Sequence, residues 1–145
     1  ELETYLKENF SILSVTRKIE KRIGSEALML SGRVRSGQKI NAKHHLILLG
    51  DVNPGAELIA GGDILIMGSF RGIASAGQPD NEDAIVLALD FRPTQIQIAK
   101  LMAAGLPSSP HRKHPEFAYI DNGVIVVEEY LEANPFGRLP RIETR

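Results

Sequence analysis

Several hallmarks of secreted and membrane proteins are missing from this 145-residue chain. It contains no cysteine, which excludes disulfides and thiolate metal sites and is consistent with a reducing compartment. It has no run of 18 apolar residues and no signal-peptide pattern. The formal net charge is −1, which argues against bulk binding to nucleic acid or to a membrane, so any such site has to be local.

Catalytic signatures are missing as well. The sequence has no Gly-x-Ser-x-Gly turn, no phosphate-binding glycine loop with lysine and no Ser/His/Asp spacing. His44 and His45 are adjacent, so on a strand they point to opposite faces and cannot both hold one metal ion. His111 and His114 lie in a proline-rich stretch without cysteines or clustered carboxylates. We therefore predict no catalytic residues, no metal site and no cofactor.

The sequence does contain a repeat, between residues 28 and 77. Gly32, Gly50 and Gly68 are 18 residues apart, and each opens a similar phrase. Within this period lies a six-residue one, which is typical neither of a helix nor of a plain amphipathic strand. Three sixes predict a mainly β fold, a three-sided β-helix of about 18 residues per coil. The apolar positions expected to point inward are Val34, Ile40, Leu46, Val52, Leu58, Ile64, Phe70 and Ala76.

The chain divides into four expected parts. Residues 1–16 have the pattern of a short helix and a strand, which cannot form a core alone, so we expect them to end a truncated N-terminal domain. Residues 17–27 predict a linker, residues 28–130 the β-helix and residues 131–145, with two prolines and a glycine, a flexible tail. Because the chain begins with Glu1 rather than methionine, we expect missing upstream sequence.

The repeat changes after residue 77. The acidic insert, residues 78–83, lengthens the offset from 18 to 21 residues, and Arg92 then repeats Arg71 at that distance. Farther along, Asp121-Asn-Gly123 is a hairpin turn signal between two strand-like pieces. We therefore expect the regular coils to end in this part of the chain.

The repeat also predicts where surface charges lie, because residues 18 apart stack on coils about 4.8 Å apart. Arg33 stacks on Asp51 and Lys39 on Glu57, and such opposite-charge neighbours contribute about 0.2–1 kcal/mol each. Beside them we predict an arginine ladder without an acidic member, made of Arg35, Asn53, Arg71 and Arg92.

The arginine ladder lies next to a corner rich in small residues. Ser36, Gly37 and Gly55 leave the backbone accessible there. Unneutralised arginines beside such a corner indicate either a docking surface for an acidic partner or a solvated basic stripe. The residues alone leave both interpretations open.

Three stretches carry a resemblance to a known family. They are Arg35-Ser-Gly-Gln38, the run Gly50-Asp-Val-Asn-Pro-Gly-Ala-Glu-Leu-Ile-Ala-Gly-Gly-Asp-Ile64, and Arg71-Gly72 with Ala76-Gly77. They resemble the C-terminal domain of the MinC family of septum site-determining proteins over roughly residues 30–130. The resemblance implies a dimeric β-helix that binds the ATPase MinD and, with it, blocks assembly of the division protein FtsZ. The chain would then be cytoplasmic and peripheral to the inner membrane through its partner.

The same resemblance implies which residues contact MinD. Ile73 departs from relatives that carry arginine at this position, so that contact is not expected here. The residues that match the family's MinD-binding motif and its neighbouring coils are Arg35, Ser36, Gly37, Gln38, Asn53, Gly55, Arg71 and Gly72.

A dimer surface is expected near the end of the repeat, where an open coil edge would otherwise aggregate. Its apolar candidates could equally be ordinary core residues. They are Ile96, Ile98, Leu101 and Met102.

Two other classes of function are compatible with a triangular solenoid. A hexapeptide-repeat acyltransferase or a β-helical carbonic anhydrase would place His44 or His45 at a coil interface. A polymer-forming structural solenoid would need uncapped ends. The family resemblance favours an adaptor and division inhibitor over both.

Overall fold

The computed structural model describes residues 26–104 and 115–130 of the chain. The predictions for residues 1–16, for most of the linker and for the tail lie outside these residues. Within them the chain forms eleven strands: β1 Ala27–Ser31, β2 Lys39–Ala42, β3 His45–Leu49, β4 Glu57–Ala60, β5 Ile64–Phe70, β6 Ile73–Ala76, β7 Val86–Phe91, β8 Gln95–Ile98, β9 Leu101–Ala104, β10 Glu116–Asp121 and β11 Val124–Glu129.

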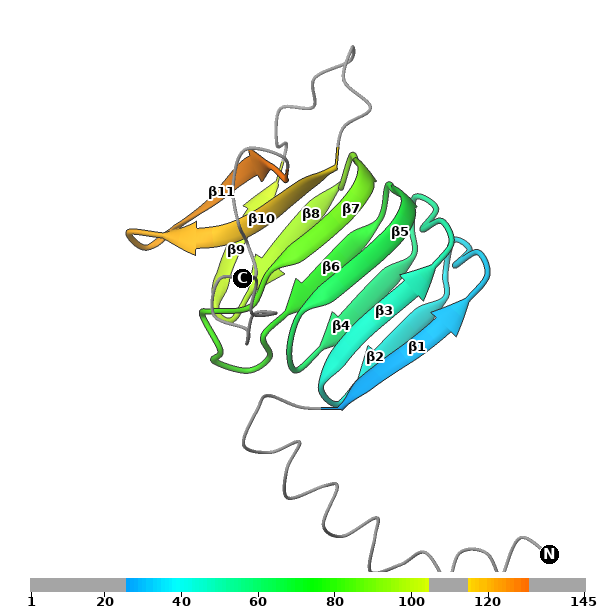
Figure 1. Ribbon diagram of the computed structural model, residues 1–145, viewed down its shortest axis with the longest axis horizontal. Helices are drawn as coiled ribbons and strands as arrows, with labels where there is room; N and C mark the ends of the chain where they lie inside the picture. The colour runs from blue at the N-terminus through cyan, green and yellow to red at the C-terminus, as the bar shows by residue number, and fades with distance from the viewer. Residues whose placement is uncertain (1–25, 105–114, 131–145) are drawn as a thin grey trace, which may run out of the picture. The chain divides into compact units, whose positions relative to one another are not determined.

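The strands wind into a solenoid with two wide sides and one narrow side (Figure 1). One wide side is a six-stranded sheet in the order β1-β3-β5-β7-β10-β11, and the other is a five-stranded sheet in the order β2-β4-β6-β8-β9. The narrow side is held by isolated parallel bridges from Val34 to Val52 and from Val52 to Phe70. The prediction of a three-sided β-helix is confirmed.

The six-residue period correctly predicts the core. Seven of the eight predicted inward residues are buried, and Ile40, in the first coil, is partly buried against them. Phe70 pairs in register with Phe91, which confirms the offset of 21 residues across the acidic insert. Their rings pack edge to face with centres 6.0 Å apart.

The 18-residue stacking fails at one place, because Leu58 pairs with Ala74 rather than with Ala76. The turn between β5 and β6 has only two residues, Arg71 and Gly72, so β6 starts two residues early. Gly72 makes this short turn possible, since a Cβ atom there would lie 2.5 Å from the Ala56 carbonyl oxygen. The acidic insert then restores the stacking of the next coil.

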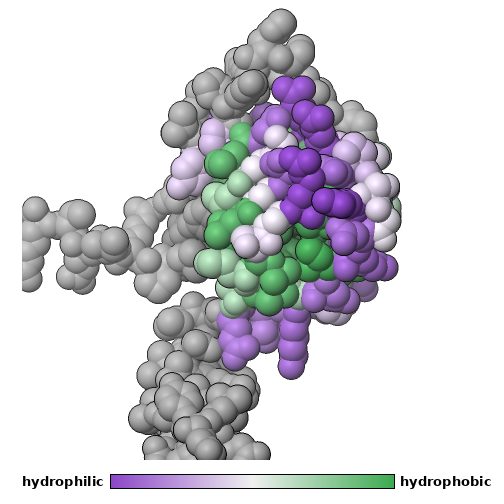
Figure 2. Space-filling model, turned by 90° about the vertical axis from the view of Figure 1, so that its right-hand side faces the viewer, coloured by the Kyte–Doolittle hydropathy of each residue, from purple (hydrophilic) through white to green (hydrophobic). Residues whose placement is uncertain are grey.

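The two ends of the solenoid differ. At the C-terminal end, β9 folds back antiparallel onto β8, and the hairpin of β10 and β11 pairs antiparallel with β7. At the N-terminal end, among the residues described, no strand lies outside β1 or β2. Figure 2 views this end, where apolar side chains lie beside a hydrophilic rim. A hollow of about 250 Å³ there is lined by Leu30, Val34, Ile40 and Leu48 with polar neighbours.

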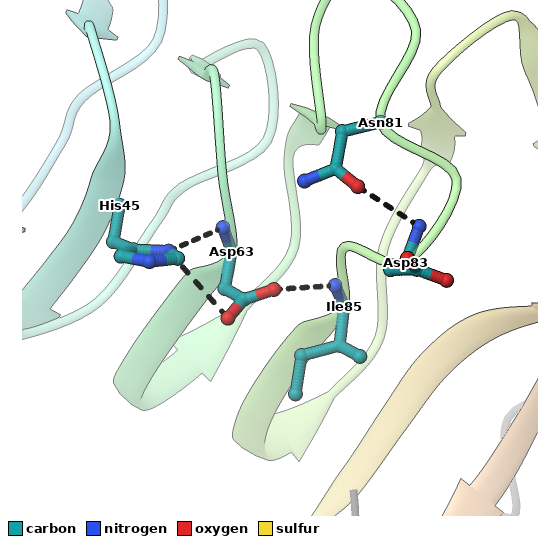
Figure 3. Close-up of polar contacts among 5 residues, drawn as sticks. All are labelled: His45, Asp63, Asn81, Asp83 and Ile85. Atoms are coloured by element: carbon teal, nitrogen blue, oxygen red, sulfur yellow. Dashed lines mark hydrogen bonds and ion pairs between the residues drawn. The ribbon is translucent and has the colours of Figure 1, made fainter. Parts of the chain in front are cut away.

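A buried carboxylate fixes the corner between the two sheets (Figure 3). Asp63 is buried, and its Oδ1 accepts the Ile85 N–H of the next coil at 2.9 Å. Its own N–H donates to His45 Nδ1 of the previous coil, also at 2.9 Å. A Cβ atom on Gly62 would overlap the His45 ring, so glycine allows the imidazole to lie against the backbone. Asp63 therefore ties three coils together.

We expect Asp63→Ala to lower the free energy of unfolding by about 1–3 kcal/mol, because the buried Ile85 N–H loses its acceptor. Asp63→Asn is the matched control, since its amide oxygen can still accept that bond, and it should cost less. Urea denaturation followed by circular dichroism measures both. Equal losses for the two variants would show that the carboxylate charge, not the hydrogen bond, matters at this corner.

Candidate functional site

The arginine ladder forms at the corner between the narrow side and the five-stranded sheet. Each later rung hangs on the coil before it: the N–H groups of Asn53, Arg71 and Arg92 donate to carbonyls of the preceding coil, each at 2.9 Å. Arg35 begins the column on the first coil. We call the eight residues predicted to contact a partner the docking corner: Arg35, Ser36, Gly37, Gln38, Asn53, Gly55, Arg71 and Gly72.

The last rung of the ladder differs from the prediction of a column without acids. Arg92 Nε lies 2.9 Å from Asp90 Oδ1, so this arginine is neutralised by its own strand neighbour. Asp90 and Arg92 are two residues apart and therefore project on the same side. The side chains of Arg35 and Arg71 are exposed, and neither makes an ion pair with any described residue. They lie two coils apart, or roughly 10 Å along the solenoid.

The turn that carries Arg35 is closed by its own hydrogen bonds. The Gln38 side-chain Oε1 accepts the Arg35 N–H at 2.7 Å, and the Gln38 N–H donates to the Arg35 carbonyl at 2.9 Å. Gly37 has a φ of 86°, which glycine adopts without strain. Gln38 therefore holds the backbone that presents Arg35, and its amide oxygen is already engaged.

The next coil supports this turn from below. Gly37 N–H donates to the Gly55 carbonyl at 3.0 Å, and Gly55 has a φ of 85°. The Ser36 side chain occupies the place that a Cβ atom on Gly55 would need. The two turns thus stack directly, which fixes Ser36 and Arg35 relative to Asn53.

Arg71 is positioned by a residue that the sequence did not indicate. The Thr94 hydroxyl donates to the Arg71 carbonyl at 3.1 Å, and the Thr94 N–H donates to the Gly72 carbonyl at 2.9 Å. Thr94 lies 23 residues after Arg71, outside both the 18-residue and the 21-residue offsets. The irregular fourth corner therefore hides it from the repeat.

The surrounding charges follow the predicted pairs. Arg33 lies 3.5 Å from Asp51 and Lys39 lies 3.6 Å from Glu57, both between neighbouring coils. The docking corner thus presents two free arginines beside a region where the cations are already paired. This arrangement suits an acidic partner that approaches at the corner itself.

Comparison with known proteins identifies the family. Residues 28–130 match the family model described as septum formation inhibitor MinC, C-terminal domain. This chain belongs to the MinC family. It is 42% identical over 104 residues to the probable septum site-determining protein MinC of Heliobacterium modesticaldum, and 38% identical over 125 residues to that of Prochlorococcus marinus. These matches cover 71% and 86% of this chain but only 36% and 54% of the relatives.

A solved structure agrees with the family assignment. The chain is similar to a chain of the MinC:MinD cell division protein complex of Aquifex aeolicus, with a TM-score of 0.67 and 39% sequence identity. The similarity covers 72% of this chain and 87% of that chain. MinC-family membership replaces the acyltransferase and carbonic anhydrase alternatives. His44 is exposed and His45 bonds to the Asp63 backbone.

Two further observations concern ligands and membranes. Among the residues that the structure describes, no group of three or more His, Cys, Asp or Glu side chains could hold a metal ion. Over the same residues, no helix is long and apolar enough to cross a membrane.

Two of the predicted dimer residues of this MinC-family chain are wrong. Ile96 and Ile98 are fully buried and belong to the core, because strand alternation in β8 turns Gln95 and Gln97 outward instead. Leu101, in β9, is half-buried. Met102 is 61% exposed, at the edge of the five-stranded sheet, and stays a candidate.

A larger apolar surface lies on the outside of the six-stranded sheet. Met29, Ile47, Leu65 and Leu87 pair in register across four strands and face away from the core. The sequence signal was the continuous apolar runs of β3, β5 and β7, which are typical of strands covered on both faces. We call this surface the outer apolar face: Met29, Ile47, Leu49, Leu65, Met67, Leu87 and Leu89.

Proposed function

We propose that this chain is the MinD-binding and dimer-forming part of a MinC-type division inhibitor. The single observation that carries the proposal is the docking corner, where Arg35 and Arg71 are exposed without an acidic partner among the described residues. Support comes from family membership and from the similarity to a chain of a MinC:MinD complex. Through MinD the chain would be peripheral to the inner membrane and would bring the inhibitor to sites of FtsZ assembly.

The geometry of the docking corner indicates how recognition works. Two guanidinium groups on a rigid corner can each form paired hydrogen bonds with a carboxylate. The hydrogen bonds of Gln38 and Thr94 hold the two arginine backbones before binding, so little ordering entropy is lost on association. The partner surface should therefore carry two acidic groups roughly 10 Å apart, matching two coil spacings.

The experiment that tests the function is co-sedimentation with MinD and vesicles, in ATP and in ADP. We expect this chain to sediment with MinD and vesicles only in ATP, because the resemblance implies recruitment by the membrane-associated form of the ATPase. Vesicles without MinD are the control, since the net charge of −1 gives no basis for direct binding. Sedimentation without MinD would contradict recruitment through a partner.

We also propose that the chain is a homodimer whose subunits meet at the outer apolar face. Leu49 and Leu89 are 46% and 43% exposed on this face, and exposed apolar patches of this kind mark interaction surfaces. A second copy would cover them, in an interface where each subunit contributes the same residues. Met102 lies on the other sheet and would stay exposed.

For the dimer, we expect Leu49→Asp to raise the dissociation constant roughly a hundredfold or more, because two charges would be buried in one symmetric interface. Leu49 is partly exposed in the monomer, so the fold should survive the change. Sedimentation equilibrium measures the dimer, and circular dichroism checks the fold. Met102→Asp is the matched control and should remain dimeric. Dissociation of Met102→Asp but not of Leu49→Asp would move the interface to β9.

A further inference from the structure

Charge is unevenly distributed along the solenoid. The six-stranded sheet begins with β1 and β3 in a basic stretch and ends with β10 and β11 in an acidic one. Every Lys, Arg, Asp or Glu in residues 27–50 is basic, and every one in residues 115–130 is acidic. The basic residues are Arg33, Arg35, Lys39 and Lys43, and the acidic residues are Glu116, Asp121, Glu128 and Glu129.

One border of this sheet repeats the same gradient. Lys43 occupies the corner that precedes β3, and the acidic insert occupies the same corner two coils later, before β7. Gly61 lies between them and packs against the Lys43 carbonyl, so no side chain separates the two. Asp121 follows on this border, because β10 runs antiparallel to β7. Lys43 and the insert acids make no ion pair with any described residue.

The insert presents its acids from a hydrogen-bonded loop, part of which Figure 3 shows. Asn81 N–H donates to the Gly77 carbonyl at 2.8 Å, and Asn81 Oδ1 accepts the Asp83 N–H at 3.1 Å. The bond from Ile85 to Asp63 ties the end of the loop to the coil before it. Asp80, Glu82 and Asp83 are exposed on this fixed loop.

The opposite border is already neutralised. Arg33 is paired with Asp51 at 3.5 Å, and Arg92 is paired with Asp90 at 2.9 Å. Charges available to a partner on both ends of the gradient therefore lie on the border of Lys43 and the insert.

We propose that the two copies pack their outer apolar faces about a two-fold axis parallel to the strands, so that their solenoids run antiparallel. Lys43 of each copy then lies near the acidic insert of the other, and the inference rests on the homodimer proposed above. Packed sheets keep their strands closely aligned, and the alternative two-fold axis runs along the solenoid. That alternative sets the acidic β10–β11 end of one copy against the same end of the other, and like charges in contact are unfavourable.

Spin labels test the orientation directly, because a chain without cysteine accepts single labelled cysteines cleanly. Both His44 and Val124 are exposed on this border, one near each end of the sheet. We expect a mixture of His44→Cys and Val124→Cys chains to give an inter-subunit distance shorter than either variant gives alone. In the alternative arrangement the mixed distance is the longest of the three, and that result would overturn the proposal.

Charge reversal tests the pairing. Lys43→Glu or Glu82→Lys should each raise the dimer dissociation constant roughly tenfold at low salt, because a symmetric interface contains every pair twice. The double variant should recover most of the loss, and Lys100→Glu, which is exposed at the β8–β9 turn, should change nothing. A double variant as weak as the single ones would overturn the pairing.

The same measurements separate this inference from the homodimer itself. A wild-type chain that stays monomeric in sedimentation equilibrium overturns both. A stable dimer that Leu49→Asp dissociates, but whose mixed label distance is the longest, overturns only the antiparallel arrangement.

Discussion

Arg35→Glu should abolish ATP-dependent co-sedimentation of this chain with MinD and vesicles while its circular dichroism spectrum stays native. Arg35 is exposed and makes no ion pair with described residues, so the folded chain does not depend on its charge. Removing one partner of a desolvated charge pair costs about 2–5 kcal/mol of binding, or roughly 30-fold to several thousandfold in affinity. Reversal adds repulsion between like charges to this loss.

Two variants separate the loss of a partner contact from a change in the corner. Arg33→Glu changes the same charge two residues away, where the arginine is already paired with Asp51, and should weaken MinD binding much less. Gln38→Glu keeps an oxygen that can accept the Arg35 N–H and should preserve the turn. Arg35→Glu with normal co-sedimentation would remove the docking corner from the proposed function.

The docking corner also shows what the sequence could predict. The stacking of Arg35, Asn53 and Arg71 follows from an 18-residue offset that the coils keep on this side, and the structure has this stacking. The pairing of Arg92 with Asp90 escaped because only neighbours between coils were considered, although two residues of one strand share a face. Which partner docks there came from the family resemblance, since exposed arginines alone do not name one.

The irregular corners limited the prediction of packing. Leu58 shifts to Ala74 because Gly72 allows a turn two residues shorter than the others, and a period cannot reveal a close approach to the Ala56 carbonyl. Five residues instead of six separate Phe91 from Ile96, so β8 turns its isoleucines inward. The apolar runs of β3 and β5 were visible, but only the paired strands show that their outer residues form one surface.

Phe70→Ala should lower the free energy of unfolding by about 3–5 kcal/mol, the usual cost of emptying a buried aromatic site. Phe70 is fully buried on the narrow side, between Val52 of the preceding coil and Phe91 of the next one. Isolated bridges rather than a continuous sheet hold this side there, so few backbone hydrogen bonds resist collapse around a cavity. Urea denaturation followed by circular dichroism measures the loss, and Phe70→Leu, which fills most of the volume, should cost clearly less.

The same substitution links the core to the docking corner. Phe70 directly precedes Arg71, and its carbonyl accepts the Arg92 N–H at 2.9 Å. A shift of this backbone would move the guanidinium of Arg71 relative to Arg35, so we expect Phe70→Ala to weaken MinD binding even where the chain is fully folded. Affinity measured well below the unfolding transition tests this link. Unchanged affinity with lowered stability would show that Arg71 is positioned by Thr94 and the neighbouring coils, independently of the aromatic core.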